Sequence, residues 1–415
     1  MLEQFFESTQ RIREIRNRRY GGIIVDFAAE LYRAGYATIT ARRHIRTVEH
    51  LVHWMCKKSI SITMLTEPTV SKFFDHLNRC RCPHYARSDR RNVEKGTRLF
   101  LNHLFRFDIL TTTRQKHSPC DEEMCTTFCE WMRQQRGTSD RTLNKYKSTV
   151  NRLVRSLGND TNKYTAHNLR EFLLIASKDC GWAAVKNCTT SLRMFLRFLI
   201  ATGKCPIGLD DAIPGIAHWR LSSLPQYIQP ADVEKVIGTC DPRTARGSRD
   251  RAILLLLARL ALRAGDIVEM RLCDIEWKEA WIQVTGKGRR QTRLPLTQEL
   301  GEAITHYIIN WRPAAPTDKL FLSILAPFRP FSCHSAVSVM VSRALRRADI
   351  KCAGRNSAHI FRHSAATAML RQGASLQEIA TVLRHRSTST TEIYAKIDVD
   401  SLLEIAQPWP EVESC

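Results

Sequence analysis

Apolar residues in the N-terminal half recur at helical spacing, and two stretches repeat the same pattern. Residues 35–52 match residues 137–154 at a constant offset, and both begin with a glycine. Looser matches follow further along, namely Val70 and Phe73 with Leu169 and Phe172, and residues 98–105 with 192–199. Arg and Lys occupy the remaining face of each predicted helix. We therefore predict two helical DNA-binding domains in tandem, over residues 1–112 and 113–205.

The pattern changes between Pro206 and Pro230, a stretch rich in proline and glycine that lacks sustained periodicity. Such a composition is typical of a linker. A helix is predicted from about Ala231, and a second over 250–262 is apolar on all sides, so it belongs in a core. These helices open a third domain, predicted over residues 231–415.

Two short strands are predicted in this third domain, at 281–285 and 291–295. The sequence Gly-Lys-Gly at 286–288 lies between them and predicts a hairpin tip from which Lys287 projects. The predicted fold class is therefore α+β, mainly α with a small antiparallel β-sheet in the C-terminal domain.

The C-terminal stretch returns to helices. Ser357 can cap a helix that carries His359 and Arg362 and ends near residue 373. Ser375 and Glu378 form a capping box for a short second helix that stops around residue 385.

A third helix is predicted after that one. Ser389 and Glu392 repeat the capping-box pattern. The helix displays Tyr394, with Ile393 and Ile397 supplying its buried side.

The charge balance points to a polyanionic partner. The chain has 63 Lys and Arg against 41 Asp and Glu, a formal net charge of +22, and such a surface favours nucleic acid. A membrane would also attract it, but the longest apolar run, 252–258, is far shorter than the roughly 20 residues of a membrane span. No signal peptide is recognisable. We expect a soluble, cytoplasmic protein that uses no membrane and keeps its cysteines reduced.

Several of the 14 cysteines cluster. Cys80, Cys82 and His84 lie close together, which makes a zinc site conceivable. The spacing Cys-x-Cys-Pro-His is not usual for a zinc finger, however. Cys125 and Cys129, one helical turn apart, are typical of small buried apolar residues. We therefore expect no bound metal.

The C-terminal domain contains the side chains needed to cut DNA with a protein nucleophile. Arg263 and Arg362 can each donate two hydrogen bonds to non-bridging phosphate oxygens, because a guanidinium fork matches phosphate geometry. His359 and His385 can add donors or accept the tyrosine proton. A phosphate could thus be held without a metal ion.

Two further residues complete this set. Lys287, on its turn, has the reach and the proton suited to a leaving 5′ oxygen. Tyr394 would become the covalent carrier. Each residue alone is a weak signal, because a lone tyrosine is usually buried structure and a hairpin lysine is usually solvated. The interpretation as a DNA-cleaving site therefore depends on all of these residues occurring together and in this order.

Four motifs resemble the signature of the tyrosine recombinase, or phage integrase, family. They are Leu-Arg-Ala-Gly-Asp at 262–266, Gly-Lys-Gly at 286–288, His-Ile-Phe-Arg-His at 359–363, and Leu-Arg-His at 383–385 followed by Ile-Tyr at 393–394. The resemblance assigns catalytic roles to the matching positions, which are Arg263, Lys287, His359, Arg362, His385 and Tyr394, with Asp266 in support. It implies a 3′-phosphotyrosyl intermediate, a free 5′-hydroxyl, and neither a divalent metal nor a nucleotide cofactor.

Two positions depart from the family pattern. The family usually has Thr-Gly before its first Leu-Arg and a glycine before the histidine of its last motif. This chain has Leu260 and Ala261 at the first place and Arg384 at the second. The extra cation beside His385 either contacts a neighbouring phosphate or is solvated.

The implied function is a site-specific recombinase that breaks and rejoins duplex DNA without ATP. The long N-terminal region and Pro-Trp-Pro at 408–410 are similar to large transposon-borne recombinases. The resemblance implies a homotetramer on DNA in a prokaryotic nucleoid, with or without companion recombinases.

Two other functions compete with this interpretation. A type IB topoisomerase has a similar active site but relaxes DNA without exchanging strands between partners. The tandem helical domains argue against it, because they favour a defined site. A DNA-binding architectural protein without catalysis is the second alternative, and the presence of every catalytic position argues against that.

Overall fold

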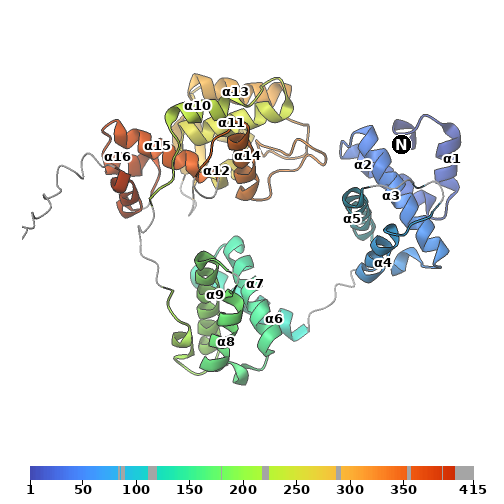
Figure 1. Cartoon of the computed structure of the whole chain (residues 1–415), viewed down its shortest axis with the longest axis horizontal. Helices are drawn as coiled ribbons and strands as arrows, with labels where there is room; N and C mark the ends of the chain where they lie inside the picture. Colours follow the sequence, from blue (N-terminus) through green and yellow to red (C-terminus); the bar gives the residue numbers. More distant parts are fainter. Residues whose placement is uncertain are drawn as a thin grey trace, which may run out of the picture. The chain divides into compact units, whose positions relative to one another are not determined.

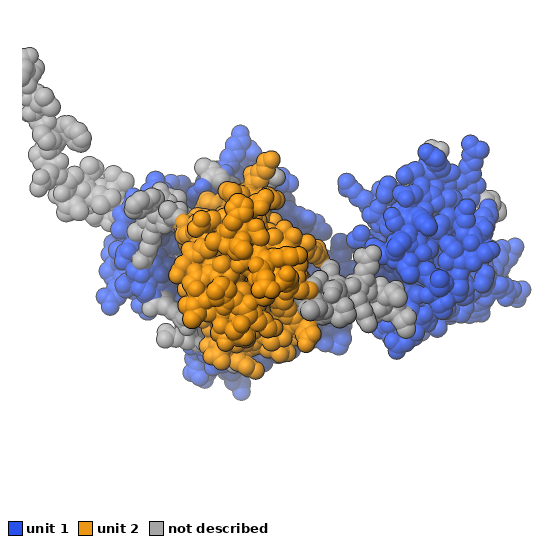
Figure 2. Space-filling model, turned by 90° about the horizontal axis from the view of Figure 1, so that it is seen from below, with its two compact units in different colours: residues 1–110, 223–415 blue, residues 111–222 orange. Residues whose placement is uncertain are grey.

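The computed structural model of the chain describes residues 1–82, 85, 89–110, 119–178, 180–216, 224–286, 291–352, 357–385 and 387–397, and gives only the backbone at 119–122. The chain forms two compact units, one made of Met1–Leu110 with Ser223–Cys415 and the other of Thr111–Ser222 (Figure 2). Helices dominate both units, and the strands among the described residues lie in the C-terminal part.

The first 110 residues form a helical bundle around an apolar core (Figure 1). Its elements are η1 (Leu2–Gln4), α1 (Thr9–Asn17), α2 (Gly21–Arg33), α3 (Thr38–Lys57), η2 (Ile62–Met64), α4 (Glu67–Leu77) and α5 (Arg90–Arg106). Helix α3 packs against α2 and α5. Its apolar residues recur on one face, so Val48, Leu51 and Val52 are all buried.

The second unit is a separate helical body, drawn in orange in Figure 2. Its elements are α6 (Pro119–Arg136), α7 (Asp140–Leu157), η3 (Thr161–Lys163), α8 (Ala166–Ser177), α9 (Trp182–Ala201) and η4 (Leu209–Ala212). The rings of Phe128, Phe195 and Phe198 contact one another in its core. Cys125 and Cys129 are buried there, as the sequence predicted.

The sequence repeat corresponds to a repeated order of helices. The series α3, η2, α4, α5 is matched by α7, η3, α8, α9, and the first helix packs on the last in each series. Aligned apolar residues are buried in both copies, as Val48 and Val150 show on α3 and α7, and Phe73 and Phe172 on α4 and α8. The repeat seen in the sequence thus corresponds to two similar sets of helices.

The stretch from Pro206 to Pro230 is anchored at both ends. Near its start, Ile213 is buried in the core of the second unit and its carbonyl accepts a hydrogen bond from Arg193 Nη2 at 2.8 Å. Near its end, Ile228 is buried in the C-terminal core, and its N–H donates to Ser364 Oγ at 2.9 Å. The composition predicted a plain linker, and did not reveal η4 or these contacts.

The C-terminal part is built around one helix buried on all sides. This helix, α11 (Ala245–Arg259), holds residues 252–257 at 0% exposure, and Thr244 caps it through the N–H of Gly247. The helices around it are α10 (Pro230–Gly238), α12 (Ala264–Glu269), α13 (Gln298–Asn310), α14 (His334–Arg347) and α15 (His359–Arg371). The predicted all-round apolar helix is confirmed, although it begins five residues earlier than expected.

A three-stranded antiparallel sheet in the order β1-β2-β3 accompanies these helices. Strands β2 (Trp281–Thr285) and β3 (Gln291–Pro295) have the predicted bounds, with Trp281 opposite Pro295. Strand β1 (Ile275–Glu276) was not predicted, because two residues are too few to show an alternating pattern. The tip with Lys287 lies outside the described residues.

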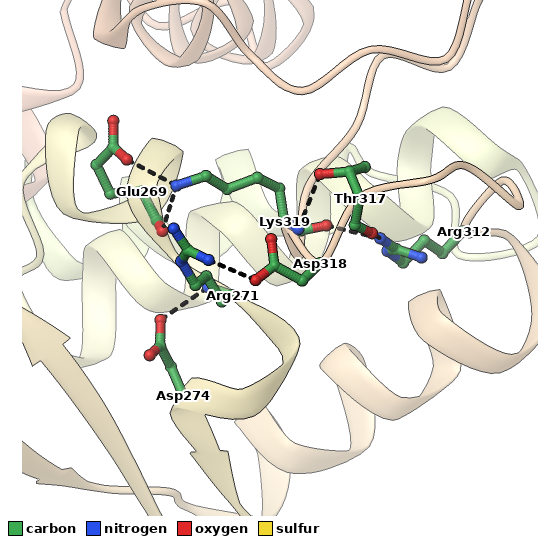
Figure 3. Close-up of polar contacts among 7 residues, drawn as sticks. All are labelled: Glu269, Arg271, Asp274, Arg312, Thr317, Asp318 and Lys319. Atoms are coloured by element: carbon green, nitrogen blue, oxygen red, sulfur yellow. Dashed lines mark hydrogen bonds and ion pairs between the residues drawn. The ribbon is translucent and has the colours of Figure 1, made fainter.

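A polar network ties the segment after α13 to the end of α12 (Figure 3). Lys319 Nζ pairs with Glu269 Oε2 at 2.6 Å, and Arg271 Nη1 with Asp318 Oδ2 at 2.6 Å. Arg312 donates to the carbonyls of Thr317 and Lys319. The exposed ion pairs contribute little individually, but together the contacts hold the segment beside the helix that carries Asp266.

The last elements carry most of the predicted site. Helix α15 is the predicted helix with His359 and Arg362, although Ala358 rather than Ser357 is its N-cap. The capping box of Ser375 and Glu378 is confirmed at the start of α16 (Leu376–Val382). The predicted third helix consists of two 3-10 turns, η6 (Thr388–Thr390) and η7 (Glu392–Ile397), and the second carries the tyrosine.

The fold class is α+β, mainly helical with one small antiparallel sheet, as predicted. Within the described ranges, no helix is both long and apolar enough to cross a bilayer. The polar side chains of the predicted site all come from the C-terminal part.

Candidate active site

The described members of the predicted catalytic set come from four neighbouring elements. Arg263 is the N-cap of α12, and Asp266 lies in its first turn. Two more members, His359 and Arg362, lie on α15, while His385 follows α16. Tyr394 lies on η7, which packs on α15 and α16. Lys287 lies outside the described residues.

Arg362 is the buried centre of this group, with 4% of its surface exposed. Its Nη1 donates to the carbonyl of Ala261 at 2.6 Å, and its Nη2 donates to the carbonyl of Leu383. Burial, and then the charges of Arg263 and Arg384, lower its pKa to about 10. It therefore stays charged at neutral pH and ties α15 to the turns before α12 and after α16.

Tyr394 is 2% exposed and packs among the apolar side chains of Ala366, Ile379 and Leu383. Its hydroxyl lies 2.8 Å from Nδ1 of His363. Burial raises the pKa of Tyr394 to about 12, with Arg362 acting in the opposite direction. The phenol is therefore neutral at neutral pH, and His363 is its hydrogen-bond partner.

The histidines around Tyr394 are held neutral. Burial, followed by nearby positive charges, lowers the pKa values of His363 and His385 to about 4. Desolvation, and then Arg362 and Arg263, also lower the pKa of His359. His385 Nδ1 lies 2.8 Å from Thr391 Oγ1, which fixes its ring. Neutral imidazoles can accept a proton, so they can serve as bases.

The sequence predicted that Arg384 contacts a phosphate or is solvated, but in the structure its side chain pairs with a carboxylate of the protein. Its Nη2 lies 2.7 Å from Asp266 Oδ2, and both side chains are about one-tenth exposed or less. Asp266 Oδ2 also accepts the backbone N–H of Arg263 at 3.1 Å, and Arg263 Nη2 donates to the Arg384 carbonyl. Nε and Nη1 of Arg384 are buried with no protein partner among the described residues.

The two departures from the family pattern share a backbone conformation. Ala261 and Arg384 both have positive φ angles, of 47° and 53°. Glycine adopts this region at little cost, whereas residues with a Cβ are strained there. The carbonyls of residues 261, 383 and 384 receive the arginine hydrogen bonds. The backbone of these two turns thus places its carbonyls where Arg263 and Arg362 donate to them. Both turns are strained, because Ala261 and Arg384 have a Cβ at positive φ.

The site therefore combines three arginines, three neutral histidines and one buried tyrosine. Arginines bind phosphate oxygens, and a tyrosine with a neighbouring imidazole is a nucleophile with a base. The structure adds His363 to the predicted set. Its place beside Arg362 in the motif was visible in the sequence, but nothing there indicated a contact with Tyr394.

The chain is similar to known recombinases. The model of the Phage integrase family matches residues 226–400. The y4rA protein of Sinorhizobium fredii, which carries an integrase/recombinase designation, is 32% identical over 397 residues, or 93% of this chain and 94% of its own length. Tyrosine recombinase XerC of Thermodesulfovibrio yellowstonii is 27% identical over 289 residues, covering 68% of this chain and 93% of its own.

Two solved structures share the fold. The XerH recombinase bound to palindromic difH substrate aligns with a TM-score of 0.54 at 17% identity, covering 90% of this chain and 97% of that one. A lambda integrase (75–356) dimer bound to a COC′ core site aligns with a TM-score of 0.52 at 18% identity, covering 71% and 99%.

The chain belongs to the phage integrase family of tyrosine recombinases. It is a recombinase, and its function is site-specific DNA recombination. The topoisomerase and the architectural protein are not favoured, since the y4rA match spans nearly the whole chain.

Proposed function

We propose that Tyr394 attacks a backbone phosphate of duplex DNA and forms a 3′-phosphotyrosyl intermediate, which a free 5′-hydroxyl later resolves. The observation that carries the proposal is the hydrogen bond between the Tyr394 hydroxyl and His363 Nδ1, next to Arg362. A nucleophile needs a base to take its proton and cations to stabilise the phosphate. All three are within one cluster.

Each remaining residue has a proposed role. Arg263 and Arg362 stabilise charge on the non-bridging oxygens, because each guanidinium carries five N–H donors. His359 and His385 add hydrogen bonds to the phosphate, and Asp266 holds the turn of Arg263. Lys287 donates the proton to the leaving 5′ oxygen. Cleavage replaces the bond from phosphorus to the 5′ oxygen with a bond from phosphorus to the Tyr394 oxygen, and rejoining reverses this exchange. One phosphodiester is thus exchanged for another, so no ATP is needed.

Catalysis in this scheme requires Tyr394 to move. A side chain that is 2% exposed cannot present its hydroxyl to a phosphate while it stays packed. DNA binding would draw the phosphate toward the arginines and expose the tyrosine hydroxyl, with His363 taking its proton as the oxygen attacks. The state described here is therefore proposed to be the resting one.

A suicide half-site substrate tests the nucleophile. The substrate is a cleavage site, mapped on the ends of the mobile element, in which the short fragment that carries the free 5′-hydroxyl diffuses away after cleavage and so traps the adduct. Wild type should form a detergent-stable protein–DNA adduct, whereas Tyr394→Phe should bind equally and form none. Tyr227→Phe is the control, because the Tyr227 hydroxyl contacts only Arg371 among the described contacts. A nucleotide found by mass spectrometry on another tyrosine would refute the assignment.

We also propose duplex DNA as the partner and a homotetramer as the active assembly. Two recombining duplexes contain four strands to exchange, and each protomer supplies one Tyr394. One lambda integrase structure of the same fold is a tetramer bound to a Holliday junction. Companion recombinases could replace some protomers, and mixing with candidate partners would reveal them.

The positive charge supports a clamp formed by the helical bodies and the C-terminal part around the duplex. With a net charge of +22, binding should release many counterions, so affinity should fall by roughly 10³-fold or more between 50 and 200 mM salt. Fluorescence anisotropy on a mapped site would measure this. Affinity that stays flat over that range would rule out the clamp. Transposon mobility in a prokaryotic nucleoid is the proposed biological setting.

A further inference from the structure

Four potential metal ligands converge in the N-terminal helical body. His50 lies on α3, His76 on the last turn of α4, and Cys80 and Cys82 on the segment that follows. Cys80 Sγ lies 3.2 Å from His50 Nε2, and Cys82 Sγ lies 3.4 Å from His76 Nε2. All four ligand atoms lie within 4.8 Å of one another.

This spacing fits a tetrahedral ion. Zinc is bound at about 2.3 Å by sulfur and about 2.0–2.1 Å by nitrogen, so a sulfur and a nitrogen on one tetrahedron are about 3.6 Å apart. The observed 3.2 and 3.4 Å are close to that edge. Two thiolates and two neutral imidazoles also cancel the charge of one divalent cation.

The rings are held in place by aromatic neighbours. Tyr85 stacks on His50, with ring centroids 4.5 Å apart and an interplanar angle of 12°. Phe73 and Trp54, both buried, contact the ring of His76. Both Nε2 atoms therefore face the sulfurs in fixed orientations, as a metal site requires.

A backbone N–H also lies beside one of the two sulfurs. The N–H of Cys82 points at Cys80 Sγ at 3.4 Å. An N–H donor to a coordinating atom is typical of the shell around a metal ligand, because it stabilises the negative charge on the thiolate. A neutral thiol gains much less from such a donor.

We propose that His50, His76, Cys80 and Cys82 form a structural Cys2His2 zinc site that fastens the segment after α4 onto α3. The proposal replaces the expectation of no metal. That expectation considered Cys80 and Cys82 with His84, which lies outside the described residues, and rejected them on local spacing. The ligands that the fold brings in, His50 and His76, are far away in the sequence.

The internal repeat shows that such a cluster is not needed to build the fold. At the repeat offsets, the second unit has Arg152 where α3 has His50, and Ile175 where α4 has His76. That unit still folds around a full apolar core. The four ligands are therefore an addition specific to the first copy, which favours a binding role over generic core packing.

The site also borders a basic cavity. His50 and Cys80 line a cavity of about 980 Å³ together with Arg18, Arg46 and Arg90. Tyr85, which stacks on His50, accepts a hydrogen bond from Arg18 Nη1 at 2.5 Å. Zinc would thus fix one wall of this cavity.

Metal content of the full-length protein is the first test. The chain is produced with added zinc, dialysed against a weak chelator and measured by mass spectrometry of the metal. Wild type should retain about one zinc ion per chain, and Cys80→Ser/Cys82→Ser should lose at least nine-tenths of it. Cys56→Ser/Cys205→Ser is the matched control, because it also removes two half-buried thiols and should keep the zinc.

X-ray absorption of the zinc-loaded wild type gives the ligand set directly. We expect two sulfur ligands at about 2.3 Å and two nitrogen ligands at about 2.0–2.1 Å. His50→Ala should lower the nitrogen count and weaken zinc retention. A wild-type protein without zinc after these steps would overturn the proposal, as would zinc retained by the Cys80→Ser/Cys82→Ser variant or an absorption spectrum without sulfur.

A chelator experiment covers the case in which the cysteine variant does not fold. A strong chelator added to wild-type protein should lower its thermal unfolding midpoint by several degrees, and added zinc should restore it, because bound metal stabilises the folded state. The control variant should respond equally. If the chelator leaves the midpoint unchanged, the four residues are held by thiol–imidazole hydrogen bonds and the proposal is wrong.

Discussion

The hydroxyl of Tyr394 lies 2.8 Å from Nδ1 of His363. The pKa of the tyrosine is raised to about 12 and that of the histidine is lowered to about 4, both mainly by burial. At pH 7 both groups are neutral, and in the tautomer of His363 that carries its proton on Nε2 the phenol O–H donates to Nδ1. The same imidazole that holds the resting tyrosine can therefore take its proton when the phosphate arrives.

We predict that His363→Ala slows formation of the covalent adduct roughly 10²-fold, the lower end for loss of a general base. DNA affinity should change less than twofold. Single-turnover cleavage of the suicide substrate measures the rate. His306→Ala is the matched control, since His306 Nδ1 also bonds a hydroxyl, that of Ser248, outside the site. If His363→Ala cleaves the substrate at the wild-type rate, His363 is not the base and only packs against Tyr394.

The lowered pKa values also predict how stability depends on pH. His363 and His385 have folded pKa values of about 4 against an ordinary value of 6.5. The unfolded chain thus binds protons first as the pH falls, and the free energy of unfolding declines between about pH 6.5 and 4 while staying level above pH 6.5. Each histidine accounts for at most roughly 3 kcal/mol of this loss.

Thermal unfolding midpoints of DNA-free protein from pH 7.5 to 4.5 would measure the decline. The variant His363→Gln/His385→Gln should show a shallower decline, because glutamine does not titrate. His44 in the N-terminal body also has a pKa lowered to about 4 by burial, so part of the decline will remain in the variant. Equal slopes in wild type and variant would contradict the prediction.

The sequence predicted features that depend on local patterns. The strand bounds at 281–285 and 291–295 and the capping box of Ser375 and Glu378 are set by neighbouring residues, and all are confirmed. The repeat was visible because α3 and α7 bury the same spacing of apolar residues.

Contacts between distant segments could not be predicted. The hydrogen bond of His363 with Tyr394 and the ion pair of Arg384 with Asp266 join residues 31 and 118 positions apart. A single sequence contains no signal for such pairs. Arg384 is an example. Its motif position usually holds glycine, so the sequence predicted only that its side chain lies in solvent or contacts DNA, and not that it pairs with Asp266.

The ion pair predicts the effect of restoring that glycine. Arg384→Gly relieves roughly 1–2 kcal/mol of strain at positive φ. It also leaves the buried carboxylate of Asp266 without its charged partner, with only the backbone N–H of Arg263 still bonded to it, which costs roughly 3–5 kcal/mol. We expect a net loss of about 2 kcal/mol, visible as a lower denaturation midpoint.

Two variants separate these contributions. Ala261→Gly relieves similar strain at φ 47° without removing an ion pair, so it should stay within about 1 kcal/mol of wild type. Arg384→Gly/Asp266→Asn should recover part of the loss, because the buried charge is gone. A more stable Arg384→Gly would mean that the ion pair contributes less than the strain.

The tail after Tyr394 is predicted to join protomers. Residues 398–415 lie outside the described residues, and their sequence has an apolar stripe of Leu402, Leu403 and Ile405. Deleting this tail should leave single-site DNA binding intact and abolish synapsis, measured as loss of the paired-site complex on native gels. A control that replaces only residues 408–415 should keep synapsis.

Packing of the stripe onto its own domain is the alternative. In that case the deletion lowers the thermal unfolding midpoint of the DNA-free protein and weakens single-site binding as well. Recombination at the wild-type rate by the deleted protein would refute docking on a neighbour.

The last prediction concerns Lys287 as general acid. An alkoxide leaving group is strongly basic and needs a proton, whereas a thiolate leaves readily without one. We therefore expect Lys287→Ala to cleave ordinary DNA at least roughly 10²-fold more slowly than wild type. The same variant should approach the wild-type rate on DNA with sulfur at the 5′ bridging position.

Arginine variants provide the contrast that makes this test specific. Arg263 and Arg362 are proposed to stabilise the non-bridging oxygens, and that need persists whichever atom leaves, so Arg263→Ala should stay slow on the sulfur substrate. Lys278→Ala, which removes an exposed lysine from the turn between β1 and β2, should cleave both substrates normally. If Lys287→Ala cleaves the sulfur substrate as slowly, relative to wild type, as it cleaves ordinary DNA, then Lys287 only positions DNA. The proton would then have to come from His359 or His385, whose lowered pKa values make them poor acids at neutral pH unless bound phosphate raises them.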